Sequence, residues 1–302
     1  MSELGSFPTN ATAMPKRSGT ERTLRFGYGT NGFGNHRLTD SLELLAEQGY
    51  DGVAVTLDHD HLDPFHPDVA EHTTRLRRDL ERLELDVVVE TGARYLLDPR
   101  HKHHPTLLSE HGRALRLDLL HRAVHIAAQL RAGVVSFWSG TKPDHLDDET
   151  AWSLLAEGCS EVLDTAAEYG VRLGFEPEPG MFVQDLDGFE QLAAKLNHPE
   201  LFGVTLDIGH CRCLEPVDVP ACVRRAGPDL VNVQIDDMRR GVHEHLEFGE
   251  GDIDFPPVMA ALREVGYRGL VSVELPRHSH AAPAVAQRSL RFLRQAATEV
   301  TA

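Results

Sequence analysis

The sequence predicts an α/β protein folded as a single (β/α)8 barrel, and three observations lead to this fold class. From Leu24 onward, eight short apolar or β-branched runs alternate with helix-length amphipathic segments, as in repeated β-α units of a parallel sheet. Junctions in which a helix ends at glycine and a strand follows occur at Gly49, Gly170 and Gly266. The chain of 302 residues is long enough for one barrel of about 250 residues and a tail.

Each predicted strand is a short run of mostly apolar residues that ends close to a polar or glycine-containing segment. The strands cover residues 24–28, 52–56, 86–90, 133–137, 172–176, 203–207, 230–235 and 270–274. Between the first two strands, Leu38, Leu42 and Leu45 share one face of a predicted helix, which ends at Gly49. Eight such units close into a barrel, whereas a doubly wound sheet usually has about six strands.

A doubly wound sheet also tends to carry a glycine-rich phosphate loop after its first strand. Here the segment GYGTNGFGNH (27–36) has glycines but lacks the GxGxxG spacing. We therefore interpret it as a flexible loop at the barrel mouth, and phosphate binding is the competing interpretation.

Composition limits the classes of partner. No run reaches the roughly 18 to 20 apolar residues that span a bilayer, so we expect no membrane insertion. The formal net charge of −17 disfavours nucleic acid, whose phosphates require cationic contacts. Four cysteines in 302 residues do not suggest a disulfide framework, and residues 1–22 lack the features of a secretory signal. We expect a disordered tail over 1–22, a catalytic barrel over 23–302 and a cytoplasmic location.

Oxygen donors stand at the ends of the last four predicted strands. They are Glu176, Asp207, Gln234 with Asp236, and Glu274, each about one β-α unit apart. The carboxyl ends of barrel strands meet at one mouth, where unpaired buried carboxylates repel each other unless they are protonated, paired with cations or bound to a metal. Oxygen donors favour Mn2+ or Mg2+, and Co2+ or Zn2+ become suitable if imidazole joins them.

The residues around these donors resemble a known family, the xylose isomerase-like TIM barrels. The resemblance covers roughly the C-terminal half, in FEPEPG (175–180), TLDIGH (205–210), VNVQIDD (231–237), HEHLEFGEGDIDF (243–255) and SVEL (272–275). It implies that Glu176, Asp207, Gln234 and Glu274 hold the metal and that the two glutamates act as acid and base. Many relatives carry histidine at the position of Gln234, and this departure weakens the case for zinc more than the case for a metal.

The resemblance implies an isomerase or epimerase of a small keto-sugar, polyol or cyclitol that works through an enediolate. A dehydratase or β-elimination lyase on a keto-sugar or inosose would use the same metal site and the same proton abstraction, so this alternative stays open. A barrel that binds a metabolite without turnover is a minor alternative. An endonuclease, as in one branch of the family, conflicts with the net charge. The expected partner is a sugar-like small molecule, and the resemblance also allows a homo-oligomer.

Further candidates follow from position. His210 matches the family's D-x-x-H, which implies a catalytic or substrate-binding role. His245 belongs to an H-x-H before a GEG turn and is a candidate ligand or substrate contact. Arg94, in the loop after the third strand, could bind an anionic group. Trp138 and Lys142, after the fourth strand, could contact a sugar ring, although Trp138 could equally be ordinary packing.

Overall fold

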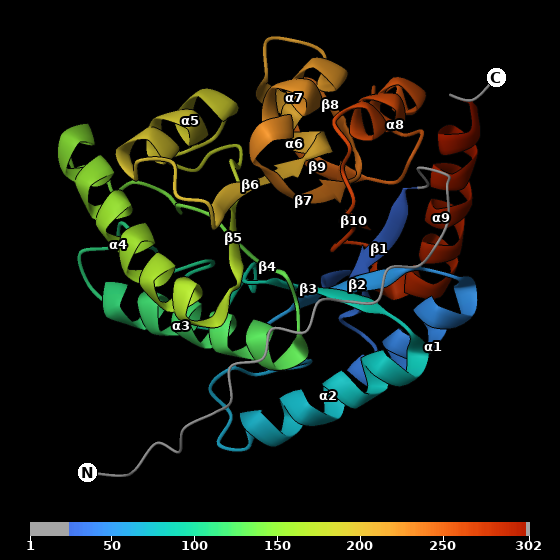
Figure 1. Cartoon of the computed structure of the whole chain (residues 1–302), viewed down its shortest axis with the longest axis horizontal. Coiled ribbons are helices and arrows are strands. Elements are labelled where there is room, and N and C mark those ends of the chain that lie inside the picture. Colours follow the sequence, from blue (N-terminus) through green and yellow to red (C-terminus); the bar gives the residue numbers. More distant parts are fainter. Residues whose placement is uncertain (1–23, 300–302) are drawn as a thin grey trace.

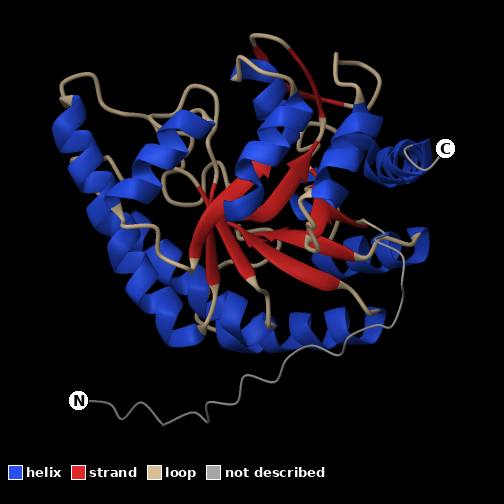
Figure 2. Ribbon diagram, turned by 45° about the horizontal axis from the view of Figure 1, so that its top comes forward, coloured by secondary structure: helices blue, strands red, loops and turns tan. Residues whose placement is uncertain are grey.

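A computed structural model describes residues 24–299, and within them eight parallel strands close into a barrel surrounded by helices (Figures 1 and 2). The strands meet around the ring in the order β1-β10-β7-β6-β5-β4-β3-β2. This arrangement confirms the predicted (β/α)8 barrel. The predicted tail, residues 1–22, lies outside the described residues.

The barrel strands begin and end within one residue of the predicted ranges. They are β1 (Arg25–Gly29), β2 (Gly52–Thr56), β3 (Asp86–Glu90), β4 (Val134–Phe137), β5 (Arg172–Phe175), β6 (Phe202–Asp207), β7 (Leu230–Ile235) and β10 (Leu270–Val273). Each strand pairs in parallel with its two neighbours in the ring.

The helices lie outside the ring and cover it. They are α1 (Leu38–Gln48), α2 (Val69–Leu83), α3 (Arg113–Leu130), α4 (Asp148–Tyr169), α5 (Leu186–Lys195), α6 (Ile208–Leu214), α7 (Val219–Ala226), α8 (Phe255–Glu264) and α9 (Ala282–Glu299), with short 3-10 turns η1 (Thr30–Phe33), η2 (Gly227–Asp229) and η3 (Ser279–Ala281). Within residues 24–299, no helix is both long and apolar enough to cross a bilayer.

Local sequence signals explain where these helices begin and end. Asp147, Asp185 and Asp218 cap the N-termini of α4, α5 and α7, and each side chain accepts a hydrogen bond from the backbone N–H three residues later. Gly49 ends α1 with φ of 91°, a conformation that glycine adopts without steric cost. The chain then enters β2 within three residues.

Apolar side chains close the N-terminal end of the barrel interior. Ala54, Val88, Val134 and Leu270 come from four different strands and form one buried cluster, here called the plug. Successive side chains of a strand point to opposite faces, so the residues two positions later also face the interior. Those residues are the polar Thr56, Glu90, Ser136 and Ser272, which are all buried. The interior therefore changes from apolar to polar toward the mouth.

Two features differ from the sequence-based expectation. The segment interpreted as a flexible loop contains η1, in which Thr30 and Phe33 are fully buried and Thr30 Oγ1 accepts a hydrogen bond from Thr56 N. An antiparallel hairpin, β8 (Asp237–Arg239) and β9 (Val242–Leu246), extends beyond the barrel after β7. The predicted eight-unit pattern did not include this hairpin, because its five-residue second strand lacks apolar alternation.

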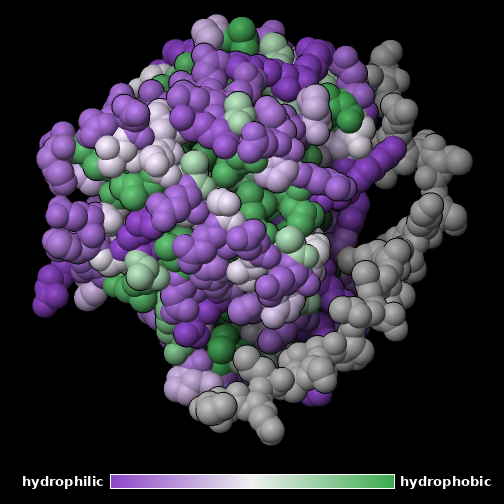
Figure 3. Space-filling model, turned by 60° about the vertical axis from the view of Figure 1, so that its left-hand side comes forward, coloured by the Kyte–Doolittle hydropathy of each residue, from purple (hydrophilic) through white to green (hydrophobic). Residues whose placement is uncertain are grey.

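Figure 3 presents one face of the molecular surface, coloured by hydropathy. Hydrophilic side chains predominate there, and hydrophobic ones appear in small groups between them. Isolated exposed apolar residues are normal on protein surfaces and need no partner.

We expect Gly174→Ala to destabilise the barrel. A Cβ at Gly174 in β5 would lie 2.4 Å from Thr205 Oγ1 and 3.2 Å from a methyl of Val134, so neighbouring strands would have to shift. Overpacking of this kind costs about 1–3 kcal/mol, which urea denaturation can measure. Gly133→Ala is the matched control, because a Cβ there meets nothing within 4 Å. Equal loss of stability in both variants would contradict this account of the packing.

Candidate active site

A cavity of about 610 Å3 opens at the C-terminal ends of the barrel strands. We call it the mouth cavity. Its lining includes Glu90 from β3, Gln234 from β7, and Glu176 and Glu274, which directly follow β5 and β10. Residues far apart in the sequence therefore face one space, as expected for a barrel whose strands all point the same way.

Four oxygen donors gather on one side of this cavity and are here called the metal wall: Glu176, Gln234 and Glu274, which line it, and the buried Asp207 beside them. Their strands, β5, β6, β7 and β10, are adjacent in the ring. Asp207 and Gln234 are direct partners in the β6–β7 register. One possible ligand atom of Asp207 lies within 4.8 Å of those of His245 and Glu274, and the same is true for Glu176, Asp207 and His210. The structure thus brings the predicted donors together.

Asp207 also fixes the position of His210. Asp207 is the last residue of β6 and the N-cap of α6, and its Oδ1 accepts a hydrogen bond of 2.8 Å from His210 N. The D-x-x-H spacing therefore lets the aspartate cap the helix that carries the histidine. His210 Nδ1 lies 3.2 Å from the carbonyl oxygen of Pro177, to which it can donate, and 3.5 Å from Glu176 Oε1.

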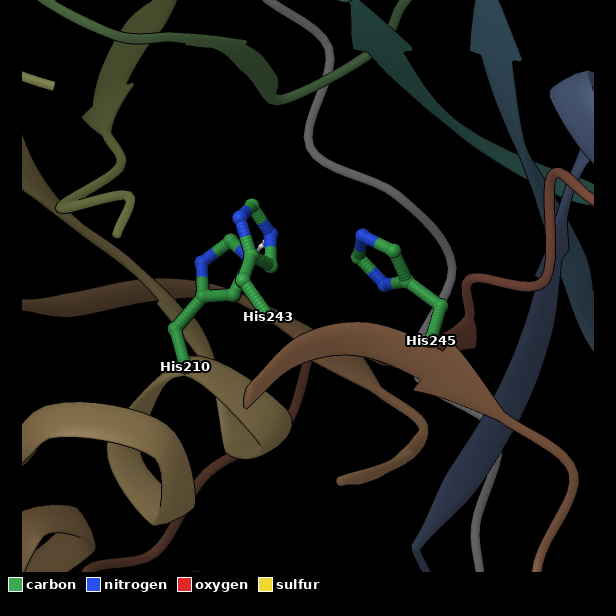
Figure 4. A group of neighbouring side chains, drawn as sticks. All are labelled: His210, His243 and His245. Atoms are coloured by element: carbon green, nitrogen blue, oxygen red, sulfur yellow. Dashed lines mark hydrogen bonds between the residues drawn. The ribbon is translucent and has the colours of Figure 1, made fainter. Parts of the chain in front are cut away.

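Three imidazoles gather beside the metal wall. Figure 4 shows His210 from α6 next to His243 and His245 from the hairpin strand β9. His210 Nε2 and His243 Nε2 are 3.1 Å apart, within hydrogen-bond distance. Burial lowers the pKa of both rings to about 4, so both are neutral at pH 7. Neutral imidazoles are the form that binds metal ions.

His245 behaves differently because it contacts a buried carboxylate. Its Nδ1 is hydrogen-bonded to Asp236, which is fully buried. Burial alone would lower the pKa of His245, but Asp236, supported by Glu274 and Asp207, outweighs burial and raises it to about 10. His245 is therefore positively charged at pH 7, and its Nε2–H is left to donate to a substrate oxygen.

The carboxyl groups of the cavity destabilise each other's charged forms. Burial, followed by repulsion from Glu274 and Glu178, raises the pKa of Glu176 well above its usual range. Burial and Glu274 raise the pKa of Glu178 to about 7. Burial also raises the pKa of Glu274. A cation at the metal wall would relieve this repulsion.

The donor atoms fit a divalent ion. Asp207 Oδ2 and Gln234 Oε1 are buried and have no hydrogen-bond partner among residues 24–299. Buried polar oxygens normally have partners, and an ion bound at the metal wall would provide one for each. This observation supports metal binding independently of any resemblance.

The other predicted contact residues divide into two groups. Arg94, Trp138 and His245 line the mouth cavity, and Trp138 Nε1 is buried without a partner among the described residues. Lys142 does not belong to the lining. Its Nζ donates to Leu146 O at 2.7 Å and pairs with Asp148 at 2.9 Å. Lys142 therefore contacts residues at the start of α4 and not the mouth cavity.

Three residues that the sequence analysis did not single out also shape the site. Asn31 Nδ2 donates to Glu274 Oε1 at 3.0 Å, and Glu178 lines the cavity. Asp237 is buried and accepts four backbone N–H bonds, from Met238 and Ile253 at Oδ1 and from Gly249 and Gly251 at Oδ2. These bonds fasten the GEG turn to the hairpin that carries His243 and His245.

Comparison with known proteins identifies the family. The model of the xylose isomerase-like TIM barrel family matches residues 42–296. This match covers both halves of the barrel, including the N-terminal half in which the sequence motifs were weak.

Curated relatives are distant. An uncharacterized protein of Methanocaldococcus jannaschii is 26% identical over 275 residues, covering 87% of each chain. L-ribulose-5-phosphate 3-epimerase UlaE of Salmonella heidelberg is 26% identical over 240 residues, covering 78% of this chain and 80% of UlaE. Inosose dehydratase of Lactiplantibacillus plantarum is 28% identical over 173 residues, which span 51% of this chain and 56% of that enzyme.

Solved structures show the same fold at low identity. An L-ribulose 3-epimerase aligns with a TM-score of 0.74 and 19% identity, covering 92% of this chain and 96% of that one. The IOLI protein, solved with a binding zinc atom, aligns with a TM-score of 0.71 and 17% identity, covering 92% of this chain and 99% of that one. At these identities the likeness concerns the fold alone.

We expect Asp237→Asn to loosen the hairpin. The new amide would turn a donor toward backbone N–H groups that now meet a carboxylate oxygen, and an unsatisfied buried group costs about 1–3 kcal/mol. Amide hydrogen exchange at Gly249 and Gly251 should accelerate, and urea denaturation should show the loss of stability. Asp252→Asn, which removes only a long pair with Arg212 at 3.4 Å, is the control. Unchanged exchange in Asp237→Asn would disprove the anchoring role.

Proposed function

The chain belongs to the xylose isomerase-like TIM barrel family, and on that premise we propose that it is a divalent-metal-dependent isomerase or epimerase. Its substrate class would be a small keto-sugar, polyol or cyclitol. The observation that carries the proposal is the metal wall, where oxygen donors from four adjacent strand ends gather beside one cavity and two of their oxygens have no partner among the described residues.

In this proposal Glu176, Asp207, Gln234 and Glu274 hold the ion. Carboxylate and amide oxygens favour Mn2+ or Mg2+, while the neutral imidazole of His210 nearby also makes Co2+ or Zn2+ suitable. When bound, the ion would polarise a substrate carbonyl and so acidify the neighbouring C–H bond.

Glu176 and Glu274 are the proposed acid and base. They directly follow β5 and β10, with β6 and β7 between these strands in the ring, so they reach the cavity from different directions. One carboxylate would take the proton next to the carbonyl, and the other would return a proton to the resulting enediolate. His210, held by Asp207 and Pro177, would bind substrate oxygen close to Glu176.

The substrate would be held by groups from several loops. Arg94 and His245 offer positively charged donors at the cavity, and Trp138 offers a ring face and an unpartnered N–H. A sugar-like molecule presents both apolar C–H faces and many hydroxyls, which suits this mixture of groups.

A dehydratase is the second candidate. The likeness to inosose dehydratase supports it, although that alignment spans about half of each chain. Both candidates begin with the same removal of a proton from carbon. Nucleic acid is a poor substrate for the cavity because the chain carries a net charge of −17.

We expect the purified protein to contain about one divalent ion per chain by elemental analysis, and we expect Glu274→Gln to lose it. The metal-loaded wild type should exchange carbon-bound hydrogen for deuterium in a panel of ketoses and an inosose in D2O. Loss of a proton-transfer group lowers rates by about 10²–10⁴-fold, so exchange in Glu274→Gln should fall at least into that range.

Glu264→Gln is the control for this experiment. Glu264 pairs with Arg224 at the exposed end of α8, which leads into the start of β10, at the end of the barrel opposite the mouth. Metal content and exchange should therefore stay at wild-type values. If the wild type binds no metal after reconstitution, the proposed mechanism is wrong and a metabolite-binding barrel becomes the better description.

A further inference from the structure

Opposite the metal wall, the mouth cavity has a second polar side. It consists of Thr56, Glu90 and Trp138 from β2, β3 and the end of β4, and we call it the polar wall. Thr56 and Glu90 stand two residues after Ala54 and Val88, which belong to the plug. The polar wall therefore begins directly above an apolar layer, in the least hydrated part of the barrel interior.

Glu90 is tied to the far side of the barrel. Its Oε1 accepts a hydrogen bond of 3.1 Å from Asn232 Nδ2, and these residues are 142 positions apart in the chain. Asn232 lies in β7, four places from β3 around the eight-stranded ring, which is the largest separation possible. The bond crosses the interior and fixes the Glu90 carboxyl at the base of the cavity.

The surroundings of Glu90 favour its protonated form. Only 6% of the residue is exposed, its hydrogen-bond donor is a neutral amide, and it forms no ion pair within residues 24–299. Burial, followed by repulsion from Glu274, raises the pKa of Glu90 to about 8. Burial is the largest cause of this shift, and it would persist with an ion bound at the metal wall.

Two further polar groups lie on this side of the cavity without a protein partner. Thr56 Oγ1 and Trp138 Nε1 are buried and unpartnered among the described residues, and both residues line the cavity. Buried polar atoms of this kind normally find a partner, which substrate hydroxyls would supply.

We propose that Glu90 is an additional catalytic acid that protonates a substrate hydroxyl leaving from the carbon β to the carbonyl, so that the enzyme eliminates water from a β-hydroxy ketone. This inference rests on the proposed function, because it uses the proton abstraction assigned to the metal-wall glutamates. It deepens that function by assigning the loss of water in the second candidate reaction to one residue, Glu90.

The step balances as follows. A metal-wall glutamate takes the proton from the α-carbon, and the C–H electron pair forms the enediolate. As the carbonyl re-forms, a double bond forms between the α- and β-carbons and the β-carbon–oxygen bond breaks. The departing oxygen takes the proton of Glu90 and leaves as water. One proton then passes through solvent from the metal-wall glutamate to Glu90, which restores both groups.

The test separates proton abstraction from water loss. Metal-loaded wild type and Glu90→Gln are incubated in D2O with 2-keto-myo-inositol and, separately, with D-tagatose. Deuterium uptake and loss of one water are followed by NMR and mass spectrometry. We expect Glu90→Gln to keep deuterium uptake within about tenfold of the wild type while water loss falls by about 10²–10⁴-fold.

Several results would overturn the inference. Water loss at the wild-type rate in Glu90→Gln would do so, as would a folded, metal-loaded Glu90→Gln that loses deuterium uptake as well. Uptake without water loss in the wild type would leave an isomerase or epimerase without this lyase activity. No uptake in the wild type would instead reject the proposed function itself, and the inference with it.

Two more variants keep the result decisive. Glu178→Gln removes a half-buried carboxyl that lines the cavity outside the metal wall and has a raised pKa, and if it alone abolished water loss, Glu178 would be the acid. Glu90→Asp withdraws the carboxyl by one methylene and serves if Glu90→Gln does not fold. Its water loss should slow relative to deuterium uptake, and an unchanged ratio would count against Glu90. Thermal unfolding and metal content are measured for every variant.

Discussion

The site depends on how a cluster of buried carboxyl groups is neutralised in one small cavity. Each carboxylate removed from water loses solvation, and each neighbour of like charge adds repulsion. Different residues meet this constraint in different ways. Asp236 is hydrogen-bonded to His245, and Glu90 is favoured in its protonated form. Asp207 lies within metal-binding distance of Glu176 in one group of possible ligands and of Glu274 in another, where a divalent ion could offset their charge. The neutral His210 and His243 complete the surroundings without adding charge.

The fold and the position of the metal wall could be predicted from the sequence because both follow from local patterns and from barrel topology. Short apolar runs and amphipathic helices are local patterns, and a closed parallel barrel brings all strand ends to one side. Knowing that Glu176, Asp207, Gln234 and Glu274 end or follow strands is then enough to place them at one mouth. No knowledge of side-chain conformations is needed for that step, because the topology supplies it.

Contacts that depend on closure of the strand ring or on the direction of a side chain could not be predicted from the sequence. Asn31 reaches Glu274 only because β1 and β10 become neighbours when the ring closes. The polar contact of Glu90 with Asn232 crosses the whole barrel. Lys142 was placed at the mouth by its position after β4, but its flexible side chain turns to Leu146 and Asp148. The Asp237 anchor joins backbone groups of an irregular turn, for which the sequence carries no periodic signal.

The apolar plug makes the barrel interior open toward one side. Ala54, Val88, Val134 and Leu270 fill the interior below the polar layer, so among the described residues the mouth cavity is the route for polar molecules. Under the proposed function, ion, substrate and product would all pass through this one opening, and an ion held beneath the substrate would have to be loaded first.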